Sequence, residues 1–284
     1  MLKLDSWTKF VVAAFLCGLL YGYRYQLFFN PILSRFVSLQ NHLVMTQAHD
    51  LTITRVRLAA EDTARFIDEN MQSVESFPDR YELFKHSIRA AKLDGLYCEF
   101  GVWKGESVNF IADLVPSKTV HGFDSFEGLP ESWRDGFGRG AFAINGLPPV
   151  RKNVVLHKGW FDKTVPEFHA QYLQPVAFVH MDADLYSSTA TVFDGMADRI
   201  VPGTVIQFDE FFNYPGWRNG EFKAFNELVA KRNLHYSFLG YSDQQAAVLI
   251  TGVSQTNSST SSAAARASSK PGSATDSPAR STTN

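Results

Sequence analysis

Cysteine is scarce in this chain of 284 residues, because only Cys17 and Cys98 are present. Two cysteines support neither a disulfide framework nor a zinc cluster. Runs of basic residues are also absent, and 27 Lys and Arg stand against 29 Asp and Glu, which gives a net charge of −2 at pH 7. A nucleic-acid-binding surface is therefore not indicated. The chain is 45% hydrophobic, which is enough for one sizeable α/β domain with extensions.

A long apolar run is missing as well. The uncharged, mostly apolar stretch Phe10–Tyr23 covers fourteen residues, whereas a bilayer-spanning helix needs about 20. The stretch fits a short signal anchor or the core of a signal peptide, and a hydrophobic helix packed on the domain is the alternative. We favour membrane anchoring over cleavage, because no clear small-x-small cleavage site follows the run.

The rest of the chain is organised around the segment GLYCEFGVWKGES, residues Gly95–Ser107. Leu96–Phe100 is rich in large apolar residues, as in a buried strand, and Ser107–Leu114 has helical spacing. Gly101 allows a sharp backbone turn and the close approach of a ligand, and Gly105 lets the helix start close to the strand. The pattern predicts a strand, a glycine turn and a helix.

The next predicted strand, Thr119–Phe123, ends at Asp124. An acidic residue about 20 positions beyond a glycine turn is placed to accept hydrogen bonds from a ribose diol. The turn has the spacing Glu-x-Gly-x-x-x-Gly, which suits a nucleoside with an amino-acid tail better than a pyrophosphate. That spacing disfavours a nicotinamide dehydrogenase, and a tight turn without any ligand is the remaining alternative.

Five segments carry a resemblance to a known family: EFGVWKGES, FDSFEGLP, HKGWF, MDADLYSST and FDEFF. In this order and spacing, between about Arg80 and Thr251, the chain resembles the macrocin O-methyltransferase family of class I S-adenosylmethionine (SAM)-dependent methyltransferases. The resemblance implies an α/β, Rossmann-like fold with a mixed seven-stranded sheet. Its strand order would be 3-2-1-4-5-7-6, with a terminal antiparallel hairpin.

The resemblance also implies how SAM is bound. The first glycine turn would hold the methionine end, the end of the second strand the ribose, and the turn after the third strand, Val154–Lys158, the adenine. Trp160 has the alternative of filling the core. The cofactor-binding residues that we predict are Glu99, Gly101, Gly105, Ser107, Asp124, Ser125, Gly159, Trp160 and Phe161.

Acidic residues follow two further predicted strands, Pro175–Met181 and Thr204–Phe208. Carboxylates at one edge of a sheet repel one another, and oxygen ligands favour Mg²⁺, Mn²⁺ or Ca²⁺ over zinc. Helix capping is the alternative role. The resemblance places a divalent cation, which we expect to be Mg²⁺, on Asp182, Asp209 and Glu210, and we predict Asp182 or Asp184 as the catalytic base, with His180 and His157 as weaker candidates.

The expected activity is SAM-dependent, metal-assisted O-methyl transfer to a hydroxyl of a small molecule or sugar moiety. A non-catalytic SAM- or nucleotide-binding module and methyl transfer to nitrogen are the alternatives. We read Gly128–Val150 as an acceptor-binding lid, and the helical stretch His42–Val74 as a lid or a dimerisation arm of a homo-oligomer. Because SAM is made in the cytoplasm, we expect the catalytic domain there, with or without membrane attachment.

These predictions divide the chain into four parts. Residues 1–35 form the hydrophobic segment and residues 36–92 a helical extension or lid. Residues 93–252 form the methyltransferase domain, in which an antiparallel pair of strands, Tyr236–Gly240 and Gln245–Thr251, follows the predicted helices Ser187–Ile200 and Glu221–Arg232. Residues 253–284 form the last part; from Ser254 onward they are rich in Ser, Thr and Ala and lack large apolar side chains, so they are predicted to be a disordered tail.

Overall fold

A computed structural model of the protein describes residues 6–254, apart from the side chains of residues 23–30, 43 and 46–48 in its first helix. The tail that we predict from residue 253 onward lies outside the described residues, except for Val253 and Ser254. Within the described residues, the centre of the domain is one seven-stranded sheet.

The strand order of the sheet is β3-β2-β1-β4-β5-β7-β6, as predicted. β1 to β5 run parallel, and β7 runs antiparallel to both β5 and β6. The order changes direction between β1 and β4, which is where ligands bind in open α/β sheets. The strands are β1 (Leu96–Phe100), β2 (Val120–Asp124), β3 (Val154–Lys158), β4 (Val176–Met181), β5 (Val205–Phe208), β6 (Leu234–Ser242) and β7 (Gln245–Val253).

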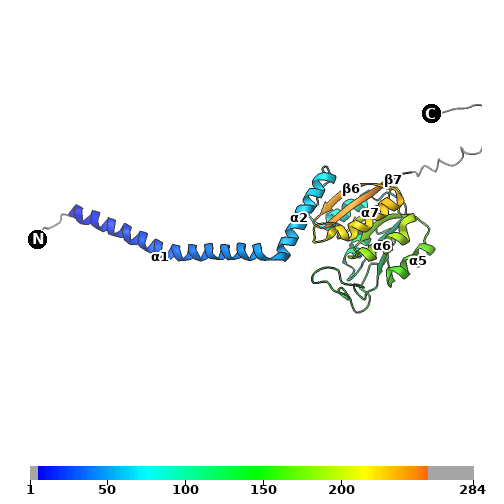
Figure 1. Ribbon diagram of the computed structural model, residues 1–284, viewed down its shortest axis with the longest axis horizontal. Coiled ribbons are helices and arrows are strands. Elements are labelled where there is room, and N and C mark those ends of the chain that lie inside the picture. Colours follow the sequence, from blue (N-terminus) through cyan, green and yellow to red (C-terminus); the bar gives the residue numbers. More distant parts are fainter. Residues whose placement is uncertain (1–5, 255–284) are drawn as a thin grey trace, which may run out of the picture. The chain divides into compact units, whose positions relative to one another are not determined.

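Helices cover both faces of the sheet, and each face has its own apolar core (Figure 1). Side chains alternate along β1, so Leu96, Cys98 and Phe100 pack beneath α5, α6 and α7, whereas Tyr97 packs beneath α3 and α4. The helices are α3 (Arg80–Ala90), α4 (Glu106–Leu114), α5 (Phe161–Gln171), α6 (Tyr186–Met196) and α7 (Glu221–Arg232), with short 3₁₀ turns η1 (Ala197–Arg199) and η2 (Trp217–Asn219).

Residues 6–49 form one helix, α1 (Ser6–His49), which continues through the boundary that we expected at residue 35. Large apolar side chains in the Phe10–Tyr23 stretch are exposed, for example 72% of Phe10 and 60% of Leu20. Between residues 6 and 254, no helix has the length and apolar character needed to cross a bilayer. The predicted membrane attachment stays a prediction.

Helix α2 (Leu51–Asn70) begins at Asp50, whose carboxylate accepts hydrogen bonds from two backbone N–H groups of the first turn. The second half of α2 is part of the core that lies beneath α7. Phe66 is 8% exposed and packs edge-on against Trp217 and Phe222, with ring centroids 5.6 and 5.4 Å away. The Thr63 hydroxyl accepts a hydrogen bond from the Asn213 N–H at 2.9 Å. This half of α2 therefore supports the segment between β5 and α7.

We predict that Phe66→Ala lowers the free energy of unfolding by about 3–5 kcal/mol, because it leaves a cavity among aromatic rings. Urea unfolding followed by circular dichroism measures this change. Val56→Ala is the matched control, since Val56 lies on the same helix but is 48% exposed, and it should change the stability by no more than about 0.5 kcal/mol. If Phe66→Ala changes the stability as little as Val56→Ala does, α2 is not part of the core.

Candidate active site

A cavity of about 660 Å³ opens at the carboxyl ends of the parallel strands, and its volume lies within the range of about 300–1,000 Å³ that is usual for ligand pockets. Most of the predicted site residues line it. Glu99 and Gly105 do not: Glu99 is fully buried, and a side chain at Gly105 would point toward Pro148 rather than into the cavity. The predicted residues in its wall are Gly101, Ser107, Asp124, Ser125, Gly159, Trp160, Phe161, Asp182, Asp184, Asp209 and Glu210.

The glycine turn after β1 lies directly against the end of β4. Gly101 has a φ of +94°, and a Cβ atom there would lie only 1.7 Å from the backbone oxygen of Asp182. No other residue fits, so glycine is required by the approach of the two strand ends as well as by the turn itself. The contact fixes the loop that precedes α4 relative to the acidic residues after β4.

Asp124, at the end of β2, holds this same loop. One of its carboxylate oxygens accepts hydrogen bonds from the N–H groups of Val102 and Trp103 at 2.9 and 2.7 Å, and the other accepts from the Phe126 N–H at 2.6 Å. A carboxylate has about four acceptor positions, so capacity for a further donor remains. Asp124 thus has a structural role that the sequence did not reveal, in addition to facing the cavity.

The turn after β3 contributes an aromatic wall. Trp160 lines the cavity and is 37% exposed, whereas Phe161 packs edge-on against Phe100 with ring centroids 5.7 Å apart. Trp160 thus faces the cavity and does not fill the core, which was its alternative role. Phe161 lines the cavity and also packs on a core residue. An indole in this position presents a flat face to a planar ligand.

Two groups of possible metal-ligand atoms lie at the ends of β4 and β5. Oxygens of Asp182, Asp184 and Glu210 lie within 4.8 Å of one another, and Asp182 also belongs to a second group of this kind with Asp209 and His180. The predicted metal ligands Asp182, Asp209 and Glu210 are therefore distributed over two overlapping groups, which Asp184 and His180 complete.

Burial and mutual repulsion shift the titration of these carboxyl groups. Burial, followed by the negative charge of Asp209, raises the pKa values of Asp182 and Glu210 well above their usual range. Burial also raises the pKa of Asp184 to about 7, although the Arg134 guanidinium opposes the shift. Glu210 Oε2 is buried without a hydrogen-bond partner among the described residues. This orphaned oxygen and the all-oxygen donors around it fit a hard divalent cation.

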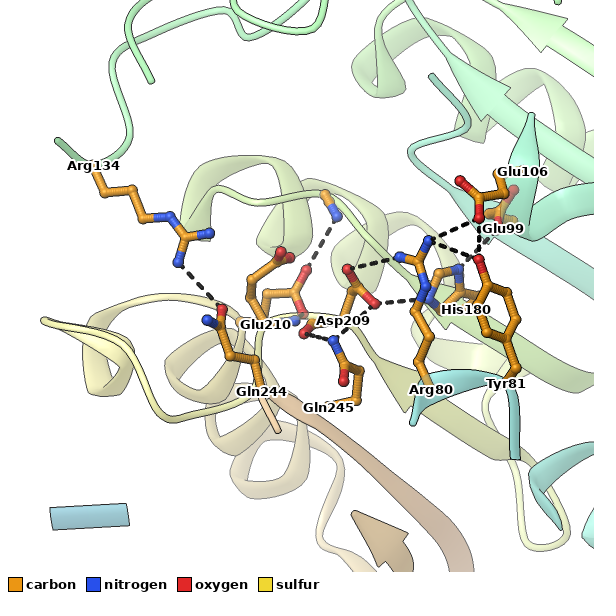
Figure 2. Close-up of polar contacts among 12 residues, drawn as sticks. Arg80, Tyr81, Glu99, Glu106, Arg134, His180, Asp209, Glu210, Gln244 and Gln245 are labelled. Carbon is orange, nitrogen blue, oxygen red and sulfur yellow. Dashed lines mark hydrogen bonds and ion pairs between the residues drawn. The ribbon is translucent and has the colours of Figure 1, made fainter. Parts of the chain in front are cut away.

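His180 links the acidic group to β1 (Figure 2). Its Nδ1 lies 2.8 Å from Glu99 Oε1 and its Nε2 lies 3.8 Å from Asp209 Oδ1, and both His180 and Glu99 are fully buried. Although burial favours the neutral ring, contacts with Asp209 and Glu99 raise the pKa of His180 to about 10. These contacts favour the imidazolium form, which has no nitrogen free to accept a proton, and they therefore argue against His180 as the base.

Two arginines that the sequence analysis did not predict lie on either side of the acidic residues in the view of Figure 2. Arg80, the first residue of α3, lies 3.6 Å from Asp209. Arg134 comes from the predicted lid, stacks 3.8 Å above the Trp133 ring and donates a hydrogen bond to Gln244 at 3.2 Å. Both line the cavity. No local motif marks either arginine, because each meets its partners only in the folded chain.

Gly128–Val150 is irregular throughout, as predicted, and its aromatic residues reach the cavity. Trp133, Phe137 and Phe142 line the wall, together with Trp103 from the glycine turn. A hydrogen bond of 2.6 Å from the Ser187 hydroxyl to Glu131 ties this loop to α6. The cavity wall thus has an aromatic part from the lid and the glycine turn, which we call its aromatic side, and an acidic part at the ends of β4 and β5, which we call its acidic side.

Comparison with known proteins agrees with this architecture. Residues 98–211 match a protein-family model described as a methyltransferase domain. The fold is similar to that of the calicheamicin methyltransferase CalS11 in its crystal structure, with a TM-score of 0.51 and 24% sequence identity over 60% of this chain and 78% of that one. The shared fold confirms the predicted Rossmann-like methyltransferase fold, and the match to the family model agrees with the resemblance from which that fold was inferred.

Two characterised relatives share part of the sequence. One is 8-demethyl-8-(2,3-dimethoxy-alpha-L-rhamnosyl)-tetracenomycin-C 4'-O-methyltransferase of Streptomyces olivaceus, which is 27% identical over 47% of this chain and 59% of its own length. The other is mycinamicin III 3''-O-methyltransferase of Micromonospora griseorubida, which is 25% identical over 52% of this chain and 72% of its own length. The match thus spans less than two thirds of the tetracenomycin enzyme.

We predict that His180→Leu lowers the free energy of unfolding by about 3–5 kcal/mol, because it leaves the Glu99 carboxylate buried without its partner. The double variant Glu99→Leu/His180→Leu removes both polar groups and should cost less than either single substitution. Urea unfolding of the three variants measures the coupling. A double variant as unstable as the sum of the two single ones would show that the pair is not coupled.

Proposed function

We propose that this domain is a SAM-dependent O-methyltransferase that acts on a hydroxyl of a small molecule or sugar moiety. The observation that carries the proposal is a single cavity in which the glycine turn, Asp124 and the carboxylates after β4 and β5 meet. Both relatives are named as O-methyltransferases, and the name of the first describes a rhamnosyl-bearing substrate, which supports this choice of acceptor class.

The proposed SAM site follows the cavity wall from β1 to β3. The turn from Gly101 to Ser107 borders the methionine part, Asp124 and Ser125 accept from the ribose, and Trp160 stacks on the adenine. Gly105 and Glu99 support the site from outside the cavity wall, since Gly105 allows the start of α4 and Glu99 holds His180. The free acceptor capacity of Asp124 favours its proposed role.

The acidic side of the cavity is the proposed reaction centre. An alcohol is a poor nucleophile until its proton leaves, and Asp184, which lines the cavity beside the other carboxylates, is placed to accept that proton. Asp182, Asp209 and Glu210, with Asp184 adjacent, are the residues that would hold a divalent cation. Such a cation would lower the pKa of a bound hydroxyl and orient its oxygen.

The aromatic side is the proposed acceptor site. Trp103, Trp133, Phe137 and Phe142 offer flat apolar surfaces on which the body of an acceptor can pack, while its hydroxyl group faces the carboxylates. Acidic groups outnumber the two arginines in the wall of the cavity. An uncharged acceptor is therefore favoured over an anionic one.

We predict that Asp124→Ala weakens SAM binding at least about tenfold, because it removes charge-assisted hydrogen bonds worth about 1.5–3 kcal/mol each. Titration calorimetry measures the affinity, and a melting curve tests whether the variant is folded, since Asp124 also holds the turn. Asp113→Ala is the control, because Asp113 lies on neighbouring α4, outside the cavity wall. Unchanged affinity in folded Asp124→Ala would remove Asp124 from the ribose site.

We predict that EDTA abolishes methyl transfer while SAM still binds, and that added Mg²⁺ restores the activity. Asp209→Asn should behave like the chelated enzyme, and its main loss should be in kcat. Calorimetry should show that this variant binds Mn²⁺ more weakly than the wild-type protein does. Asp198→Asn, an exposed change on η1, should leave both properties unchanged. Full activity in EDTA would exclude the cation from the mechanism.

A further inference from the structure

Glu221 is a fully buried carboxylate that lines no part of the cavity. It is the first residue of α7, and its two oxygens accept hydrogen bonds from two different turns. Oε1 accepts from the Ala183 N–H at 3.1 Å, and Oε2 accepts from the Glu210 N–H at 3.3 Å. A single side chain therefore joins the turn after β4 to the turn after β5.

Both of these backbone groups belong to the acidic turns. Ala183 lies between Asp182 and Asp184, and Glu210 follows Asp209 directly. Because Glu221 binds the main chain, it leaves these acidic side chains free to face the cavity. Its position fixes the separation of the two turns, and with it the separation of the carboxylates that they carry.

The turn after β4 needs such support. Asp184 has a φ of +60°, in the left-handed region that residues other than glycine rarely adopt. The Leu185 N–H donates back to the Ala183 oxygen at 2.5 Å, which closes a tight loop around Asp184. Strained conformations of this kind persist only where the surrounding structure holds them, and Glu221 accepts from the residue immediately before the strained one.

Helix capping does not account for Glu221. An acidic residue in the first turn of a helix interacts favourably with the helix dipole, but α7 has no side-chain hydrogen bond at its N-cap. Both hydrogen bonds described for the Glu221 side chain instead go to turns outside α7. The geometry thus indicates a role in joining the two turns.

We propose that Glu221 is a positioning residue, which holds the turns after β4 and β5 so that the carboxylates of Asp182, Asp184, Asp209 and Glu210 converge on one point. This inference rests on the proposed function only in so far as that point is the reaction centre and cation site. The joining of the turns itself is a property of the protein without any ligand.

The test compares Glu221→Gln with Glu227→Gln. Glutamine keeps the size of the side chain, but its amide nitrogen cannot accept from the second backbone N–H. Glu227 lies on the same helix, is exposed and bonds the Tyr186 hydroxyl at 2.7 Å, so Glu227→Gln makes the same chemical change away from the site. We expect Glu221→Gln to speed amide hydrogen exchange at Ala183 and Glu210 at least tenfold, while Glu227→Gln leaves both unchanged.

Calorimetry provides the second readout. Glu221→Gln should weaken Mn²⁺ binding at least tenfold and leave SAM affinity within twofold, since Glu221 is outside the cavity wall. Unchanged exchange at both amides would overturn the proposal, and so would faster exchange throughout the chain with equal losses of Mn²⁺ and SAM binding. If Glu221→Gln does not fold, Glu221→Asp, which is one methylene shorter, is measured in the same way and judged by the same outcomes.

Failure of the proposed function would look different. A wild-type protein that binds no Mn²⁺ would exclude the proposed cation site, whatever Glu221 does. In that case amide exchange alone decides on Glu221: faster exchange confined to the two turns supports the joining role, and unchanged exchange overturns it.

Discussion

The repulsion among four acidic side chains at the ends of β4 and β5 is the constraint on which the rest of the site depends. Burial and neighbouring charge raise the pKa values of Asp182 and Glu210, so these groups resist ionisation where they stand. The protein offsets the repulsion with cations from three separate elements, Arg80 on α3, His180 on β4 and Arg134 in the lid. A bound divalent cation would offset it more directly.

The acidic turns are also joined to the turn after β1. Gly101 brings the turn after β1 against the backbone of Asp182, and Asp124 binds two N–H groups of that turn. The proposed SAM site and the acidic turns therefore form one rigid unit across the switch point of the sheet. Methyl transfer needs such fixed geometry, because the acceptor oxygen must approach the methyl group in line.

Local pattern predicted most of the fold. The apolar runs predicted β1 and β3 with their observed ends, whereas the strand order was implied by the family resemblance and is confirmed. Helix α5 was missed, because Pro166 interrupts a stretch of mixed polarity. Arg80, Arg134 and Glu221 were not recognised as site residues, since each acquires its role through contacts with residues far away in the chain. Such contacts leave no mark on local spacing.

The two sides of the cavity are held differently. The segment from Asp209 to Gly220 is fixed by backbone hydrogen bonds to Glu221 and Thr63 and by the aromatic packing of Phe66. The lid is tied to other elements by side chains, through Glu131 to Ser187, Arg134 to Gln244 and exposed Asp135 to Arg55. The exposed ion pair between Asp135 and Arg55 adds little to this attachment. The acidic side is thus suited to a chemistry that needs fixed groups, and the aromatic side to acceptors of varied shape.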